Sequence, residues 1–183
     1  YTMVYGILRL INFAHGDIIM VGAFAVIVSV GTCGLPIWLT VIVSILCCTV
    51  LGVLIERVAY KPLRRSPPLT VLITAIGVSY LLQSLAQLVF GSEMHSFPKI
   101  VNIPALKLGE LTIKGDALAT LAVSALIMVA LTLFIGKTRM GKAMRAVSED
   151  KDAAELMGIS VNQTISVTFA IGSALAAVAG IFY

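Results

Sequence analysis

Polar side chains interrupt the first apolar stretch of the chain, RLINFAHGDIIM at residues 9–20. Asn12, His15 and Asp17 supply an amide, an imidazole and a carboxylate, and Gly16 lies between the last two. An imidazole close to a carboxylate has the groups needed for general acid–base catalysis. The same groups in an apolar segment are also typical of a broken helix lining a polar route, because polar side chains inside hydrocarbon are costly.

The broken-helix interpretation gives each residue a role. Gly16 permits the bend, and Asp17 stands at the start of the next helix, where the helix dipole stabilises a negative charge. A purely structural alternative is that Asp17 only caps a helix starting near Ile18, while Asn12 and His15 bind neighbouring carbonyls. Both interpretations remain open.

Other signals of catalysis are weak. The sequence has only two histidines, His15 and His95, and lacks the G-x-S-x-G and H-E-x-x-H patterns. It also lacks a Walker A sequence, so any ATP must be hydrolysed by another chain. Cys33, Cys47 and Cys48 do not have the spacing of a zinc or redox site and are interpreted as packing residues. We therefore predict neither an enzyme nor a metal site.

The composition places the whole chain in a bilayer. Of 183 residues, 59% are hydrophobic and 12% charged, and the mean hydropathy is +1.03, far more apolar than a soluble domain. The net charge is +4, but the basic residues lie in short connections between apolar segments, which argues against a nucleic-acid surface. The chain begins without methionine and both ends are apolar, so we interpret it as an internal part of a longer protein.

An all-α, polytopic membrane fold is predicted, with about five full transmembrane helices. A helix crossing about 30 Å of hydrocarbon needs roughly 20 apolar residues. A truncated or broken segment at 1–14 precedes the full spans, and the 16–35 span carries Asp17 at one end. The predicted spans are 16–35, 36–55, 69–90, 117–136 and 165–183.

The basic residues also predict an orientation, because positively charged connections stay on the cytoplasmic side. The connection 56–68 has four basic residues and one acid, and the loop 137–164 is rich in lysine and arginine. In the loop 91–116 the lysines are balanced by acids, so it is predicted to be external, with a small cap of strands. The helices then alternate in direction without adjustment.

The cytoplasmic loop contains a short helix with its own start and stop signals, at 148–158. Its acidic character favours a groove of a partner protein over the membrane surface, where basic helices are usual. Ser148 is predicted as the N-cap, Glu149, Asp150 and Asp152 follow in the first turns, Ala153, Ala154, Leu156 and Met157 offer apolar surface, and Gly158 ends the helix.

Two further clusters concern the spans themselves. Gly172, Ala176 and Gly180 recur at every fourth residue, which predicts close approach of a neighbouring helix. Thr74, Gly77 and the segment 79–83 place small and polar groups in the middle of the 69–90 span. These groups either pass a ligand with a polar head or form hydrogen bonds between helices.

A family resemblance rests on several of these blocks. Asp152-Ala153-Ala154 followed by Gly158 resembles the start of the pattern with which ABC importer permeases engage their ATPases, which normally opens with Glu-Ala-Ala. The blocks NFAHGDIIMVGAF, ERVAYKPLRRSPPLTVLITAIGVSYLLQ and GKAMRAVSEDKDAAELMGISVNQTISVTFAIGSALAAVAG are similar, in order and spacing, to the permease subunit of high-affinity branched-chain amino acid ABC transporters. They cover well over half of the chain.

The resemblance implies one permease domain over 1–183, truncated at both ends, in the bacterial inner membrane. It implies a second permease subunit, two cytoplasmic ATPases that bind ATP and Mg, and a periplasmic or extracellular solute-binding protein, with membrane lipid around the helices and no cofactor or nucleic acid on this chain. In that family the 148–158 helix would couple to the ATPase. A urea, amide or sugar permease of similar design, and a channel or carrier without an ATPase, remain alternatives.

Overall fold

The computed structural model describes residues 13–31, 33–64, 66–91, 106–108, 111–113 and 115–182. Over these ranges the chain is helical apart from one short hairpin, which confirms the predicted all-α class. Asn12 and nearly all of the predicted 1–14 segment lie outside the described residues.

Four helices are long and apolar enough to cross a membrane. They coincide, to within four residues at either end, with the predicted spans 36–55, 69–90, 117–136 and 165–183. They are α3 (Ile37–Ile55, continued by the π-helix η1, Glu56–Tyr60), α4 (Pro68–Phe90), α5 (Gly115–Lys137) and α8 (Val161–Phe182).

The helix at the predicted span 16–35 is shorter than expected. α2 runs from His15–Gly31 and has 17 residues, which at 1.5 Å per residue is about 26 Å and less than the roughly 30 Å of a hydrocarbon core. Two features of the following turn explain the early end. Gly34 adopts a positive φ of 59°, and Pro36 is the N-cap of α3.

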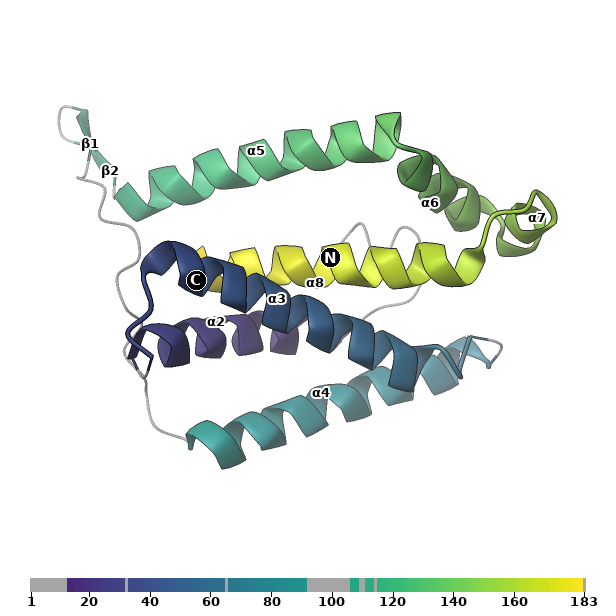
Figure 1. Cartoon of the computed structure of the whole chain (residues 1–183), viewed down its shortest axis with the longest axis horizontal. Coiled ribbons are helices and arrows are strands. Elements are labelled where there is room, and N and C mark those ends of the chain that lie inside the picture. The colour runs from purple at the N-terminus through teal and green to yellow at the C-terminus, as the bar shows by residue number, and fades with distance from the viewer. Residues whose placement is uncertain are drawn as a thin grey trace.

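Successive long helices run back and forth, so that connections gather at two ends of the molecule (Figure 1). The connection from η1 to α4 lies at the same end as α6 (Arg139–Glu149) and α7 (Lys151–Leu156). The turn from α2 to α3 lies at the opposite end, with the antiparallel hairpin of β1 (Leu106–Leu108) and β2 (Leu111–Ile113). Both basic connections thus share one end, as the charge pattern predicts, and strands occur in the 91–116 loop.

The core is a tight packing of α2, α3 and α8. Gly22 of α2 faces α8 and α3 closely, since a Cβ there would stand 3.1 Å from Ala177 Cα and 3.2 Å from Cys48 Sγ. Ser44 Oγ donates to the Gly22 carbonyl at 3.0 Å. Small residues therefore allow backbone approach in place of interlocking large side chains.

The small-residue stripe of α8 lies inside this packing. Gly172, Ala176 and Gly180 are all buried. A Cβ on Gly180 would stand 2.6 Å from the Ile19 carbonyl oxygen, so this residue faces the α2 backbone directly. In contrast, within the described part of the chain, none of the apolar window of α5 is buried, so α5 stands apart from the three-helix core.

Candidate functional site

Asp17 joins α2 to α4 inside the helical bundle. Its carboxylate is 7% exposed and accepts from Ser79 Oγ at 2.5 Å and from Gln83 Nε2 at 3.0 Å. Gln83 Nε2 also donates to Ser79 Oγ at 3.2 Å. Ser79 and Gln83 are four residues apart and so share one face of α4. The polar cluster predicted in the middle of α4 and the acid predicted on α2 therefore lie together.

The predicted capping role of Asp17 is not what the structure shows. α2 begins at His15, so Asp17 lies within the first turn, and the hydrogen bonds recorded for its carboxylate come from α4 side chains. Gly16 is likewise inside the helix, exposed, with open space where a Cβ would stand. His15 is half-buried at the start of α2.

Aromatic side chains join the same two helices about two turns further along α2. The rings of Phe24 and Phe90 stack with centroids 4.2 Å apart and planes at 8°. A hollow of about 430 Å³ lies along the α2 face from Gly16 to Ile27, lined by Met20 and Phe24 among others. We call the contact formed by Asp17, Ser79, Gln83, Phe24 and Phe90 the α2–α4 seam. An apolar groove with a carboxylate next to one end can accommodate a small molecule that has an apolar body and a cationic or hydrogen-bonding head.

The structure does not bring Thr74 and Gly77 into this cluster. Thr74 Oγ1 donates to the Thr70 carbonyl of its own helix at 2.9 Å. Gly77 is exposed, and a Cβ there would meet nothing within 4 Å. Their predicted place on a solute route therefore stays a prediction.

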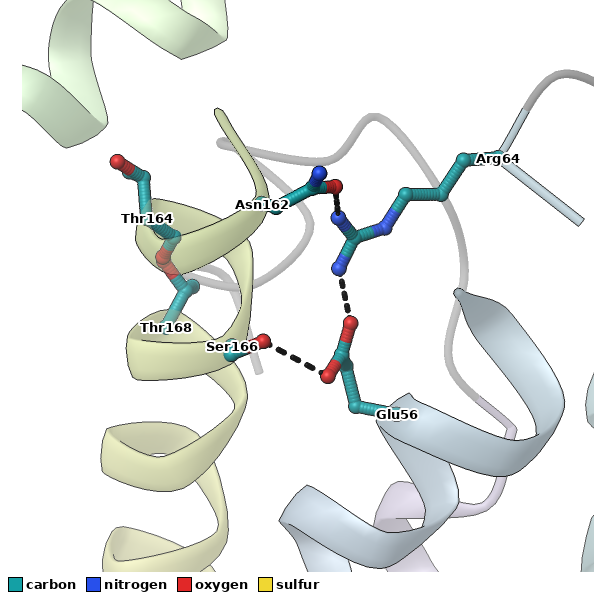
Figure 2. Close-up of polar contacts among 6 residues, drawn as sticks. All are labelled: Glu56, Arg64, Asn162, Thr164, Ser166 and Thr168. Atoms are coloured by element: carbon teal, nitrogen blue, oxygen red, sulfur yellow. Dashed lines mark hydrogen bonds and ion pairs between the residues drawn. The ribbon is translucent and has the colours of Figure 1, made fainter. Parts of the chain in front are cut away.

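A second polar cluster, at the basic end of the bundle, was not foreseen from the sequence (Figure 2). Glu56 is only 1% exposed. It forms an ion pair with Arg64 and accepts from Ser166 Oγ at 2.8 Å. Arg64 also donates to Asn162 Oδ1. The cluster ties the end of α3 and the η1–α4 connection to the first turns of α8.

Glu56 faces inward because it continues the buried face of α3, on which Ser44, Cys48 and Gly52 recur at every fourth residue. Glu56 opens the π-helix, and the Lys61 amide donates to its carbonyl at 2.7 Å across five residues. A π-helical turn shifts the following side chains relative to an α-helix and is frequent at functional sites. The one sequence signal was that Glu56 is the only acid in the basic 56–68 connection.

The predicted 148–158 helix is wrong at its start. Ser148 and Glu149 belong to the end of α6, where Ser148 Oγ donates to the Arg145 carbonyl at 2.6 Å. Asp150 is the N-cap of α7, since its Oδ1 accepts from the amides of Asp152 and Ala153 at 2.9 and 3.1 Å. Asp competes with Ser as an N-cap and here lies at the chain bend.

The end of α7 was predicted correctly, but its exposed surface was predicted only in part. Gly158 adopts φ 81° and follows the helix, as predicted. Ala154, however, is 3% exposed and packs into the protein's own core. Leu156 and Met157 are 89% and 83% exposed. The exposed apolar surface at this helix is thus formed by Ala153, Leu156 and the C-cap residue Met157.

Comparison with known proteins shows the family to which this sequence is similar. Residues 1–183 match the family described as branched-chain amino acid transport system / permease component. The chain is 41% identical over 193 residues to the high-affinity branched-chain amino acid transport system permease protein LivH of Salmonella typhimurium, covering 99% of this chain and 63% of LivH. It is 38% identical over 195 residues to the permease protein BraD of Pseudomonas aeruginosa, with the same coverage.

A more distant relative and the length of the match complete the comparison. A probable LivH of Methanocaldococcus jannaschii is 28% identical over 188 residues, covering 98% of this chain and 58% of that protein. The chain thus spans less than two thirds of the length of these relatives. No solved structure matches it significantly.

Proposed function

Because the chain belongs to the branched-chain amino acid transport permease family, we propose that it forms part of the permease subunit of an ABC importer. The full protein would move branched-chain amino acids across the bacterial inner membrane, using ATP hydrolysed by partner subunits. This chain supplies the helices of the route and no catalytic step.

The observation that carries the proposal is the α2–α4 seam. A buried carboxylate costs free energy inside a membrane and marks a route or a gate more often than a lipid-facing wall. Asp17 is held by Ser79 and Gln83 beside an apolar groove of about 430 Å³. When the seam opens, the freed carboxylate and hydroxyl can bind an ammonium group, and the groove can accept a branched aliphatic side chain.

The proposed mechanism is alternating access driven through α7. In the proposed orientation α7 lies on the cytoplasmic side, where Leu156 and Met157 contact an ATPase subunit. Two nucleotide states of the ATPase can shift the helices only if they bind α7 with different affinity. α6 transmits the movement, because it packs on both α7 and α8.

The remaining partners follow from the same proposal. A second permease subunit would complete the route. It would pack against helices of this chain whose outer faces are apolar and exposed, such as α5. A solute-binding protein would dock at the opposite end, where the β1–β2 hairpin lies. The apolar lining of the hollow along α2, next to the seam, favours an aliphatic solute over urea or a sugar.

Uptake by the complete system tests the proposal. The full-length protein, its partner permease, the ATPases and the binding protein are reconstituted in vesicles, and uptake of labelled leucine, urea and ribose is compared. Leucine should accumulate only with ATP and binding protein. Accumulation of urea or ribose instead would show that the protein transports another class of solute. Leucine flux independent of ATP would identify a channel or carrier.

A further inference from the structure

A second hollow lies at the basic end of the bundle, between η1, α6 and α8. Its volume is about 430 Å³. Its walls combine cations, amides and aliphatic side chains. They include Arg57, Lys61, Asn162, Gln163, Val53 and Val167. The function proposed above uses none of these side chains.

The charges around this hollow favour an anion. Arg57 and Lys61 are exposed and four residues apart. The one ion pair among the described residues joins Arg64 to Glu56, so neither Arg57 nor Lys61 is in an ion pair there. Glu56 also lines the hollow, but its carboxylate is balanced by Arg64 and accepts from Ser166. The two cations are therefore left to act on a ligand.

Amide groups and a helix end add to this preference. Asn162 and Gln163 lie in the first turn of α8, a helix of 22 residues. The positive end of a helix dipole favours a phosphate or carboxylate there. Arg57 offers a planar set of N–H donors that matches phosphate oxygens, and Lys61 adds a point charge.

The position of the hollow points to a ligand that also has a long apolar part. The apolar span Ile37–Tyr60 ends beside it, so the hollow lies where a helix leaves the membrane. Val53 and Val167 form its membrane side. Val167 and Val178 are eleven residues apart, about three full turns and about 16 Å along one face of α8.

That face of α8 leads to an apolar groove between α5 and α8. The groove has a volume of about 510 Å³ and is lined by Ile127, Leu131 and Val178 among others. A chain of methylene groups that starts at Val167 can therefore follow α8 into this groove without meeting a charge.

We propose that the hollow binds the phosphodiester headgroup of an anionic phospholipid of the cytoplasmic leaflet, with an acyl chain along α8. Basic pockets between transmembrane helices on the cytoplasmic side are known to take such headgroups. The proposal rests on the orientation given under the proposed function. Arg57 and Lys61 bind the phosphate, and Gln163 donates to it.

Lipid retention by the purified full-length complex tests this site. The complex is incubated with phosphatidylglycerol or phosphatidylcholine, and retained lipid is counted by native mass spectrometry. Phosphatidylglycerol should be retained preferentially. The double variant Arg57→Gln/Lys61→Gln should retain about tenfold less phosphatidylglycerol than the unaltered complex. A matched variant, Lys142→Gln/Arg145→Gln, removes two exposed cations of α6 that do not line the hollow and should retain the lipid normally.

Three results would overturn the proposal. Equal losses in both double variants would mean a diffuse charge effect. Competition by millimolar inorganic phosphate as effective as that of the lipid would mean a free-phosphate site. Loss of the ATPase subunit from the Arg57→Gln/Lys61→Gln complex would mean that the hollow is a protein interface.

Uptake measured in the same complexes separates this proposal from the function itself. Leucine uptake by the unaltered complex should rise with the fraction of phosphatidylglycerol in the vesicles, and that of the double variant should not. An absence of uptake in every lipid, with selective lipid retention intact, would refute the proposed function and support the lipid site.

Discussion

Glu56 and Arg64 form a largely buried ion pair that ties the end of α3 to the connection between η1 and α4, and both residues also bind α8. Removing one member leaves the other charge without its partner in a poorly solvated place. We expect Glu56→Gln to lower the free energy of unfolding by about 2–3 kcal/mol, somewhat less than a fully buried pair loses because Arg64 is 18% exposed. Unfolding in detergent by sodium dodecyl sulfate, followed by circular dichroism, measures this.

The control is another glutamate whose charge is solvated. Glu155 is exposed at the end of α7, so Glu155→Gln should change the unfolding free energy by less than about 0.5 kcal/mol. Equal stability of the two variants would contradict a structural role for the Glu56–Arg64 pair.

The hydrogen bond between Asp17 and Ser79 should contribute measurable coupling between α2 and α4. We expect a double-mutant cycle with Asp17→Ala and Ser79→Ala to give a coupling free energy of about 1–2 kcal/mol, since a charged acceptor strengthens a bond that averages about 0.6 kcal/mol between membrane helices. If the seam is a gate, each single variant should also either pass leucine without ATP or take up leucine more slowly with ATP.

Thr74→Ala is the matched control for the seam. The Thr74 hydroxyl bonds only within α4, to the Thr70 carbonyl, among the contacts recorded for the described residues. The same cycle with Asp17→Ala and Thr74→Ala should therefore give a coupling free energy near zero. A coupling as large as that with Ser79 would mean that α4 moves as a body and that the seam bond is not specific.

What the sequence could predict was set by length, composition and charge. Runs of about 20 apolar residues have few alternatives to a spanning helix, so four spans were located to within a few residues. The α4 partner of Asp17 and the α8 partner of Glu56 could not be predicted, because Ser79 and Ser166 lie 62 and 110 residues away on other helices. No local pattern encodes such contacts.

Local signals also failed where two residues compete for one role. Ser148 and Asp150 are both good N-cap residues, and only the bend between α6 and α7 decides for Asp150. The alternation of apolar residues in α7 could not show that Ala154 faces inward, because a six-residue helix is too short to define a face without its neighbours.

The exposed end of α7 should control coupling to the ATPase. We expect Leu156→Asp to reduce ATP-driven leucine uptake at least tenfold, about 1.4 kcal/mol of lost interface free energy, with the protein still inserted and folded. Copurification of the ATPase and solute-stimulated ATP hydrolysis measure the loss. Ala154→Asp differs, because it places a charge in the core and should reduce the amount of folded protein.

An unchanged ATPase interaction in Leu156→Asp would refute this contact surface. Lys151→Gln serves as the control, since it removes an exposed charge from the start of the same helix without touching the apolar end. It should leave both uptake and copurification within about twofold of normal.

The three-helix core should lose stability when a methyl group is added at either of two glycines where neighbouring helices approach closely. A Cβ on Gly180 would lie 2.6 Å from the Ile19 carbonyl oxygen, and one on Gly52 would lie 2.5 Å from Ser173 Cβ. Both contacts are shorter than atoms tolerate, so α8 must shift relative to α2 in the first case and relative to α3 in the second. We expect Gly180→Ala and Gly52→Ala each to cost about 1–3 kcal/mol of unfolding free energy, as overpacking does.

Gly136→Ala provides the comparison that makes this prediction specific. Gly136 lies near the end of α5, and a Cβ there meets nothing within 4 Å. Alanine should leave stability unchanged or raise it by up to about 1 kcal/mol through helix propensity. Because all three changes add the same methyl group to a helix, a loss confined to Gly52 and Gly180 can come only from packing against the neighbouring helix. A similar loss at Gly136 would trace the effect to the helix itself and remove the close-approach argument.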